Sequence, residues 1–484
     1  MNPLTSAIGT SSAEPNTTTY STRIGDLSFT HDFENGYPTD ETVDKLFNEL
    51  DFQRACQVYL WAIPIVCFAQ WQYAHENTFE AKSGDIVYYN NYVSKLGLLT
   101  ANATTPYALS FINLAETGPI VIVMPEAEVR GATHSMWQVQ ITSMVEPGKY
   151  LFYAPGKEAP PVDSSYRVFE ALTNSIFLGI RLMSTDEETR EEALQQIQIY
   201  PLADQDASGE TKVIRADDRK WQGWQPRGLE YFVRLADILG REPVDERDRF
   251  FHAMLQPLGI QKGKPFKVNK LTKQQKAILT EAAGIGEAMA KANDFYNPRL
   301  EQSHYYEGSH WEIATVCPPS QRWEEADRNY EALDGRAAWF YEAVTNDDAM
   351  QSQEAGKDQI YLAAYHDSDG DWLDGANSYR LRVPQEPTPA EEFWSTTVYD
   401  VSTRCLIDNE QQIADKSSRM PDLIVNADNS VDIYFGPEAP AGKEQNWIPT
   451  VPGRAWFTYF RLYSPTQAYF DRTWVVPDIE KASW

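Results

Sequence analysis

The sequence predicts an α+β, β-rich fold in which two β regions flank a helical segment near residues 184–295. Short apolar runs with polar turns between them lie between residues 119 and 153 and again from about Asp358 onward, as is typical of strands. Between these regions, apolar residues recur every three or four positions, which indicates amphipathic helices. The length of 484 residues is compatible with two or three domains, at about 100–200 residues each.

The first part of the chain is predicted to contain a tail and an N-terminal domain. Residues 1–38 are polar, and we expect them to be a disordered tail. Residues 39–200 form the predicted N-terminal domain. Its first helix should span 39–63, where apolar residues follow helical spacing, and Pro64 should interrupt it. Strands are predicted at 119–124, 135–141 and 151–153.

The rest of the chain is predicted to be a helical connection and a second β domain. Residues 201–325 form the helical and irregular connecting segment, after a helix predicted at 184–199. Further helices are expected at 228–239, 272–293 and 334–344. Residues 326–484 form the C-terminal β domain, with strands expected at 360–365, 378–383, 393–399, 431–435 and 455–463. Many short strands with polar turns indicate either a sandwich or a barrel.

Composition restricts the classes of partner. There are 42 basic and 70 acidic residues, so the net charge is −28, and a surface of this sign repels phosphate backbones and anionic lipid. We therefore expect no nucleic-acid partner and no membrane partner, and homo-oligomerisation is left open. The first residues lack the basic and apolar parts of a signal peptide, so a cytoplasmic location is expected, with secretion left open.

Metal and cofactor motifs are sparse. Four scattered cysteines form neither a zinc motif nor a disulfide framework, and no two histidines have the spacing of a zinc site. The run from His366 to Asp374 is rich in carboxylates, but it lacks the glycine and glutamate that a calcium-hand loop needs, so a solvated hairpin turn is favoured. No metal centre and no organic cofactor are predicted. Weakly held calcium near Asp369 and Asp371 is left open.

Two blocks of residues carry a family resemblance. The first is the run from Leu99 to Tyr107, followed by Gly118-Pro119; the second includes Phe393-Trp394-Ser395, the run Asn446 to Pro449 and Arg461 to Tyr463. The chain resembles the paired family that joins domain of unknown function 1254 (N-terminal) to domain of unknown function 1214 (C-terminal). Thr104 and Asn113 stand where the first family usually has Asp. The resemblance implies two jelly-roll-like antiparallel β-sandwich domains joined by a helical segment, and it assigns no activity.

The motif residues suggest a ligand site but leave its nature open. On the strand predicted at 455–463, Arg461 shares a face with Tyr459 and Tyr463, so it is either a structural arginine paired with a buried carboxylate such as Asp400 or a clamp for an anion. Residues 393–399 are similarly either ordinary sheet residues or part of a pocket wall. The candidate ligand-binding residues are Asn102, Thr105, Tyr107, Trp137, Trp394, Tyr399, Arg461 and Tyr463.

Function is predicted only by class. Aromatic residues make up 13% of the chain, enough to fill cores and to line a pocket. The sequence lacks the motifs of hydrolases with a serine elbow, of kinases and of dehydrogenases. We expect an enzyme acting on a small organic molecule, hydrolase- or isomerase-like and without organic cofactor, with His304, His310 and His134 as candidate catalytic residues. The alternative is a non-catalytic protein that binds a small molecule or carbohydrate.

Overall fold

The computed structural model describes residues 10–14, 17–207, 210–296, 303–314, 322–325 and 329–484. They divide into two compact units. The first comprises Met1–Trp61, Arg227–Gly240 and Val244–Met289, and the second comprises Ala62–Pro226, Arg241–Pro243 and Ala290–Trp484. The long helix α1 (Asp40–Asn77) contributes to both, because the division falls within it.

The first unit begins with a small antiparallel sheet of order β1-β2-β3. Its strands are β1 (Thr10–Glu14), β2 (Thr17–Thr22) and β3 (Gly25–Phe29). Tyr20, Leu27 and Phe29 form an apolar cluster on β2 and β3. The predicted disordered tail over residues 1–38 is therefore wrong for these strands, because a threonine-rich run with high β propensity pairs with β3 over a local apolar cluster.

The remainder of the first unit is helical. It contains the first part of α1 and most of α5 (Leu229–Arg241), α6 (Arg249–Leu255) and α7 (Lys273–Tyr296). The Tyr59 ring stacks on Tyr231 with centroids 3.9 Å apart. A Cβ at Gly286 would lie 2.5 Å from Tyr59 Cγ, so glycine is what allows α7 to approach α1 so closely. The helices predicted at 228–239 and 272–293 are confirmed.

Helix α1 does not end at Pro64, contrary to the prediction. The proline lies inside the helix, and the Pro64 carbonyl accepts a hydrogen bond of 2.7 Å from the Gln138 side chain. A proline removes one backbone hydrogen bond but need not end a helix whose residues on both sides are packed. By length and composition alone α1 is apolar enough to cross a membrane, but 72% of its most apolar window is buried inside the protein, as in a core helix.

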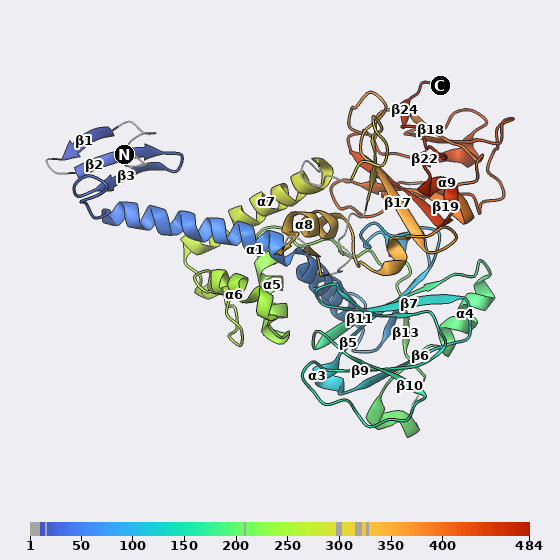
Figure 1. Cartoon of the computed structure of the whole chain (residues 1–484), viewed down its shortest axis with the longest axis horizontal. Helices are drawn as coiled ribbons and strands as arrows, with labels where there is room; N and C mark the ends of the chain where they lie inside the picture. Colours follow the sequence, from blue (N-terminus) through green and yellow to red (C-terminus); the bar gives the residue numbers. More distant parts are fainter. Residues whose placement is uncertain (1–9, 15–16, 208–209, 297–302, 315–321, 326–328) are drawn as a thin grey trace. The chain divides into compact units, whose positions relative to one another are not determined.

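The N-terminal part of the second unit is a pair of packed sheets (Figure 1). One sheet has the order β13-β4-β5-β11-β7-β8 and the other β10-β9-β6-β12. Their facing side chains form one apolar core that includes Ile112, Ile122, Phe152 and Leu178. The strands are β4 (Ile86–Tyr89), β5 (Tyr107–Asn113), β6 (Ile120–Met124), β7 (Val129–Ser135), β8 (Gln140–Met144), β9 (Gly148–Tyr153), β10 (Tyr166–Glu170), β11 (Ser175–Leu182), β12 (Gln198–Pro201) and β13 (Val213–Arg215).

Three short helices accompany these sheets: α2 (Tyr92–Lys95), α3 (Leu114–Thr117) and α4 (Glu187–Gln196). The sequence signals for α4 are correct, because the Asp186 carboxylate caps the helix by accepting a 2.8 Å bond from the Thr189 backbone N–H. The strand predicted at 135–141 is wrong. There β7 ends at Ser135, β8 begins at Gln140, and Gln138 between them has a φ of 63°. The Gln138 side-chain amide donates to the Pro64 carbonyl and accepts from the Thr345 backbone N–H. These two bonds stabilise a turn that the alternating sequence pattern does not indicate.

The C-terminal part of the second unit is another pair of sheets, of order β14-β17-β23-β19-β20 and β22-β21-β18-β24. Most strand pairs in the unit are antiparallel, and β10–β9, β13–β4 and β21–β22 are parallel. The strands are β14 (Trp311–Ile313), β17 (Gln359–Ala364), β18 (Tyr379–Val383), β19 (Ala390–Asp400), β20 (Asp415–Ser417), β21 (Val431–Gly436), β22 (Trp447–Pro449), β23 (Trp456–Pro465) and β24 (Glu480–Lys481). The unit also contains the small pair β15 (Glu324–Glu325) and β16 (Tyr330–Glu331), with helices α8 (Leu333–Glu342) and α9 (Gln467–Phe470).

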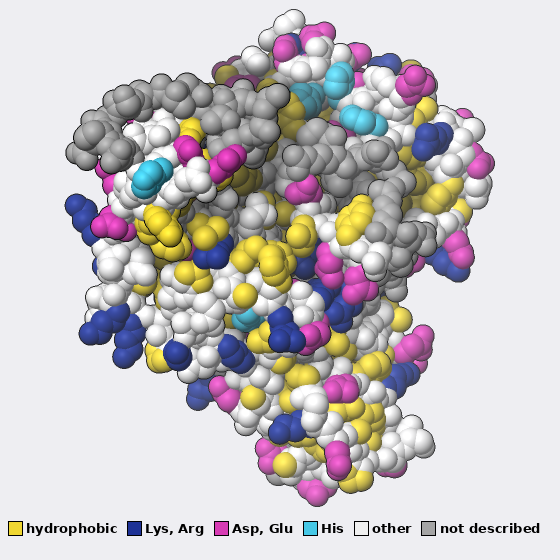
Figure 2. All heavy atoms as spheres, turned by 60° about the vertical axis from the view of Figure 1, so that its left-hand side comes forward, with side chains coloured by type: hydrophobic (Ala, Val, Ile, Leu, Met, Phe, Trp, Pro, Cys, Tyr) yellow, Lys and Arg dark blue, Asp and Glu magenta, His cyan; other side chains and the backbone are white. Residues whose placement is uncertain are grey.

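These elements confirm the predicted α+β, β-rich class with two sandwich-like domains. On the face shown in Figure 2, acidic, basic and hydrophobic side chains are interspersed. The acidic excess of the chain is therefore not gathered into one patch on that face.

Candidate functional site

A cavity of about 530 Å³ lies within the second unit, between its two β regions. One wall is the face of the six-stranded sheet opposite its apolar core, and the other is formed by β17 and β23. The segment after α8, including Thr345 and Asp347, forms a further side. A volume of this size suits a small organic molecule.

Strand register explains which side chains the first wall presents. Arg181 on β11 lies opposite Tyr107 on β5 and Arg130 on β7. Because side chains alternate along a strand, all three project to the same face. Two residues before Arg181 on β11, Gly179 lies on the same face. Phe177, two residues before Gly179, also lies on it, opposite His134 on β7.

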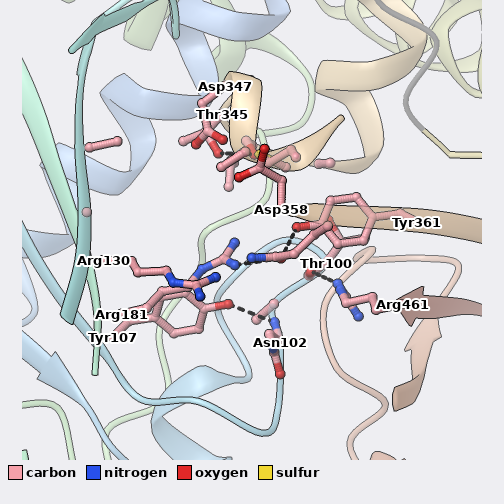
Figure 3. A pocket seen from close by; sticks show the side chains of 18 of the residues that line it. Thr100, Asn102, Tyr107, Arg130, Arg181, Thr345, Asp347, Asp358, Tyr361 and Arg461 are labelled. Carbon is pink, nitrogen blue, oxygen red and sulfur yellow. Dashed lines mark hydrogen bonds between the residues drawn. The ribbon is translucent and has the colours of Figure 1, made fainter. Parts of the chain in front are cut away.

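The second wall follows the same rule. Tyr361 on β17 lies directly opposite Arg461 on β23, and Gln359 and Tyr459 alternate onto the same face. All four line the cavity. Figure 3 shows Arg181 and Arg130 beside Tyr107 on one side, with Arg461 and Tyr361 on the other.

Arg461 is held by neutral groups. Its guanidinium donates to the Thr100 carbonyl at 2.8 Å and to the Thr397 hydroxyl at 3.2 Å, and only 4% of the residue is exposed. Its Cζ lies 5.2 Å from the Tyr361 ring centroid and 5.3 Å from that of Tyr459. Burial alone would lower the pKa of Arg461, but the surrounding phenol groups leave it raised, so the side chain stays charged.

Arg181 is held by fewer contacts. It donates to the Gln359 side-chain oxygen at 2.8 Å and lies 5.9 Å from the Tyr107 ring centroid. Its neighbour Arg130 is neutralised by Glu392 at 3.1 Å. In the part of the chain that the structure describes, no carboxylate oxygen lies within 4.0 Å of the guanidinium of Arg181 or Arg461. These two positive charges in the cavity wall therefore lack a direct counter-ion among the described residues.

His134 is the titratable group at the other end of the first wall. It is 1% exposed, and neither ring nitrogen has a hydrogen-bond partner among the described residues. Burial lowers the pKa of His134 to about 3, so the imidazole is neutral at physiological pH. Its Nε2 atom lies 4.0 Å from Asp347 Oδ2, beyond direct hydrogen-bond distance. A neutral imidazole beside a carboxylate is able to accept a proton from a bound molecule.

The first motif block, Leu99 to Tyr107, joins the two β regions. The carbonyl of Thr100 accepts from Arg461, and that of Ala101 accepts from the Tyr399 hydroxyl at 2.7 Å. The Asn102 side-chain amide donates to the Tyr463 hydroxyl. Arg461, Tyr399 and Tyr463 of the second motif therefore each bond to the first motif block, and these contacts bring the two motifs together beside the cavity.

The structure separates the predicted ligand-binding residues into two groups. Asn102, Tyr107 and Arg461 line the cavity, as does the predicted catalytic residue His134. The others lie outside the cavity lining: Thr105, Trp137, Trp394, Tyr399 and Tyr463. Tyr399 and Tyr463 contact lining residues, whereas the Trp394 indole donates to Gln385 at 3.2 Å and stacks on Phe460.

The prediction that Arg461 pairs with the carboxylate of Asp400 is wrong. Asp400 is bound by Arg454 at 3.4 Å instead. Asp400 faces Trp456 at one end of the β19–β23 ladder, whereas Arg461 faces Ser395, five residues earlier on β19. An odd offset along a strand puts the two side chains on opposite faces of the sheet, so they do not pair. The expected contacts between Arg461 and aromatic rings are present.

His304 and His310 lie away from the cavity lining. His304 is exposed and forms a β-bridge with Glu312. The Nδ1 atom of His310 is 2.8 Å from Asp478 Oδ2, and its side chain is 34% exposed. The two histidines are close in sequence, but their segment packs against the C-terminal residues, so they do not join His134.

The carboxylate-rich loop surrounds a lysine. Lys481 Nζ lies 3.2, 3.4 and 2.5 Å from Asp367, Asp369 and Asp371. Among the described residues no group of three or more histidine, cysteine, aspartate or glutamate side chains has the arrangement of a metal site. Calcium binding at this loop stays an untested prediction.

Sequence reasoning missed Arg181, Arg130, Asp347 and Gln359, all of which line the cavity. Arg181 carried a usable signal. It is a lone cation near the end of an apolar strand, on the face occupied by Phe177 and Gly179. Asp347 carried none, because it lies in an irregular segment that only the fold brings to the first wall.

Comparisons with known proteins identify the two regions. Residues 85–201 match the family described as Protein of unknown function (DUF1254), and residues 358–467 match Protein of unknown function (DUF1214). No curated protein matches the sequence.

Solved structures resemble the whole chain at low sequence identity. The VPA0106 protein of Vibrio parahaemolyticus is 16% identical with a TM-score of 0.53, and the match covers 90% of this chain and all (100%) of that chain. An uncharacterised protein from Burkholderia cenocepacia is 13% identical with a TM-score of 0.40, over 92% of this chain and 90% of that one. The first likeness supports the overall fold. The chain thus has one region that matches the DUF1254 family and a second that matches the DUF1214 family.

Proposed function

We propose that the chain binds a small organic anion in the cavity between its two β regions and acts on it as a hydrolase- or isomerase-like enzyme. The proposal uses only side chains of this chain: Arg181 and Arg461 hold the anionic group, and His134 moves a proton.

One observation carries the binding part of this proposal. Arg181 and Arg461 face one cavity from opposite walls without a carboxylate within 4.0 Å among the described residues. Withdrawing an unpaired charge from water costs several kcal/mol, so such groups are normally paired. A carboxylate or phosphate bound between the two guanidinium groups would supply the missing charge with charge-assisted hydrogen bonds.

Free donors remain on both arginines. A guanidinium has five N–H donors. Hydrogen bonds to described residues use one N–H donor of Arg181 and two of Arg461. Each side chain therefore retains N–H donors for an oxyanion.

His134 supports the catalytic part. Both of its nitrogens lack described partners inside the cavity, where a bound molecule or water would supply them. A neutral imidazole is available as a general base, and an Asp347 carboxylate 4.0 Å from its Nε2 atom would favour the imidazolium once a bound molecule or water bridges the two groups. That proton would come from a substrate carbon in an isomerisation or from water in a hydrolysis.

The binding part is tested by calorimetry with benzoate, acetate and sulfate on the full chain. We expect wild-type protein to bind an anion and Arg181→Met to bind it at least tenfold more weakly, from the loss of about 1.5–3 kcal/mol of charge-assisted bonding. Arg380→Met is the matched control, because Arg380 pairs with Glu480 at 2.7 Å and is absent from the cavity lining. Equal affinities in wild type and Arg181→Met, or no anion binding at all, would reject the proposal.

The catalytic part separates an enzyme from a non-catalytic binding protein. His134→Gln keeps a polar side chain at the site but removes the base. An enzyme of the proposed kind loses turnover of any converted anion in this variant, while retaining its affinity for that anion. If no bound anion is converted by wild-type protein, or if conversion survives in His134→Gln, the role of His134 as the general base is wrong.

A further inference from the structure

The cavity changes character along the direction of β11. Arg181, Tyr107 and Arg130 form a polar, cationic row at one end. Four residues back along the strand, Phe177 faces the same cavity. At roughly 3.3 Å per residue these two rows are about 13 Å apart along the strand.

In the middle of this wall, β11 carries a glycine, which has no side chain. Gly179 occupies β11 there, with Leu109 on one neighbouring strand and Ala132 on the other. A Cβ built on Gly179 would lie 3.0 Å from Phe177 Cε1 and 3.8 Å from a Leu109 methyl group. Glycine thus leaves room for the Phe177 ring, which reaches over Gly179 toward the arginine row.

The far end combines the Phe177 ring with its direct cross-strand neighbour, the neutral His134. Phe177 contacts Trp71, with ring centroids 6.0 Å apart, and both line the cavity. Further apolar lining residues are Leu98, Leu99, Trp339, Val344 and Met350. The rings of Phe177 and Trp71 favour hydrocarbon at this end, because each buried methylene contributes about 0.8 kcal/mol. The Asp347 carboxylate beside His134 repels a second anionic group there.

We infer that the ligand is an amphiphilic organic anion whose acidic head lies between Arg181 and Arg461 and whose apolar body crosses Gly179 toward Phe177. This inference rests on the proposed function and specifies its substrate class. It distinguishes a carboxylate, sulfate or phosphate on a hydrocarbon or aromatic body from a small polyanion that would occupy the arginine end alone.

The test measures affinity along a series of straight-chain carboxylates. Acetate, butanoate, hexanoate and octanoate are titrated into wild-type full-length protein by calorimetry. About 0.8 kcal/mol per buried methylene corresponds to roughly fourfold tighter binding for each added CH₂. We expect that gain to continue until the apolar end is filled and then to stop.

Two variants locate the apolar body. Gly179→Val displaces the Phe177 ring that packs on this glycine and narrows the path along β11, so octanoate should lose at least tenfold in affinity while acetate is unaffected. Gly284→Val is the matched control, because no atom lies within 4 Å of a Cβ at that position and it is outside the cavity lining. If Gly179→Val does not fold, the wild-type series still decides the matter, because it needs no variant.

The outcomes separate this inference from the proposal beneath it. If acetate binds as tightly as octanoate, the apolar subsite is wrong while the anion site stands. If 1-octanol binds as tightly as octanoate, the anion site itself is wrong. If octanoate binding exceeds that of both acetate and 1-octanol and falls in Gly179→Val, the inference holds.

Discussion

The two walls of the cavity each contribute an arginine from an otherwise apolar strand, but they hold it differently. Arg461, from the DUF1214 region, is almost fully buried, bonded to Thr100 and Thr397, and surrounded by tyrosine rings. Arg181, from the DUF1254 region, is partly exposed to the cavity and has one side-chain bond, to Gln359. Both arginines therefore bond across to the other β region, Arg461 through Thr100 and Arg181 through Gln359, but Arg461 is held by more contacts and Arg181 is more open to the cavity.

The largest effect is expected at Arg461. Arg461→Met removes two charge-assisted bonds, one of which is to the first motif block, so we expect a loss of about 2–4 kcal/mol in the free energy of unfolding. Urea denaturation measures this. The matched variant Arg419→Met removes a guanidinium lying 3.9 Å from the Phe393 ring, outside the cavity lining, and should cost less than about 1 kcal/mol. Equal losses in the two variants would mean that Arg461 does not join the regions.

Arg181 should show the reverse pattern. Arg181→Met removes one bond and also relieves repulsion from Arg130, its direct cross-strand neighbour. We therefore expect unfolding free energy to change by less than about 1 kcal/mol, while affinity for benzoate falls by a factor of about 10–100. Denaturation and calorimetry on the same preparation measure both quantities. A large stability loss with unchanged affinity would invert the comparison.

Glu342 provides a pH-dependent test of the second region. It is buried beside Asp294, and both of its oxygens accept bonds from Tyr365 at 3.1 Å. Burial raises the pKa of Glu342 to about 7 from its ordinary 4.5, so the folded state binds a proton more tightly than the unfolded state. The resulting stabilisation is complete below pH 4.5 and is lost as the pH rises toward 7.

Glu342→Gln should reduce that dependence. Its free energy of unfolding should fall less between pH 4.5 and 7 than that of wild type, as followed by urea denaturation across this range. Glu354→Gln is the control, because Glu354 is 68% exposed and pairs only with Lys357 at 2.6 Å. Parallel pH profiles for wild type and Glu342→Gln would show that Glu342 is ionised in the folded protein.

Tyr107 should give the smallest effect. Its hydroxyl accepts a 2.9 Å bond from the Asn102 backbone N–H and lies at the cavity. Tyr107→Phe leaves that N–H without its acceptor, which costs about 1 kcal/mol, and should weaken benzoate binding only a few-fold. Thermal unfolding and calorimetry measure the two changes. If stability is unaltered, the bond to Asn102 contributes nothing to the arrangement of the motif.

Local sequence patterns predicted most helices and strands well, but they did not predict which distant residues the fold brings together. The strands containing Ile122 and Arg461 were predicted correctly because apolar continuity and alternation are local properties of the chain. The turn at Gln138 was missed because distant partners, Pro64 and Thr345, stabilise its left-handed backbone. Helix α1 continues through Pro64 for the same reason: tertiary packing outweighs a local break.

The candidate site was likewise predicted in part: residues within local motifs were found, and residues that the fold brings to the cavity were missed. Asn102, Tyr107 and Arg461 were named from motif blocks, and His134 from its residue type, and all four line the cavity. Arg181 was missed because the apolar run that contains it was not predicted as a strand, and its position beside Tyr107 and Arg130 comes from cross-strand register. His304 and His310 were favoured for their density of titratable neighbours, a local property that says nothing about which cavity a side chain faces.

The most direct test of the central claim is a crystal structure of the full chain with 4-bromobenzoate, whose bromine is located by anomalous scattering. We predict the carboxylate within hydrogen-bond distance of Arg181 and Arg461, with the bromine directed along β11 toward Phe177. A carboxylate bound at Arg130 or on the outer surface, with the space between Arg181 and Arg461 holding only water, would contradict the account.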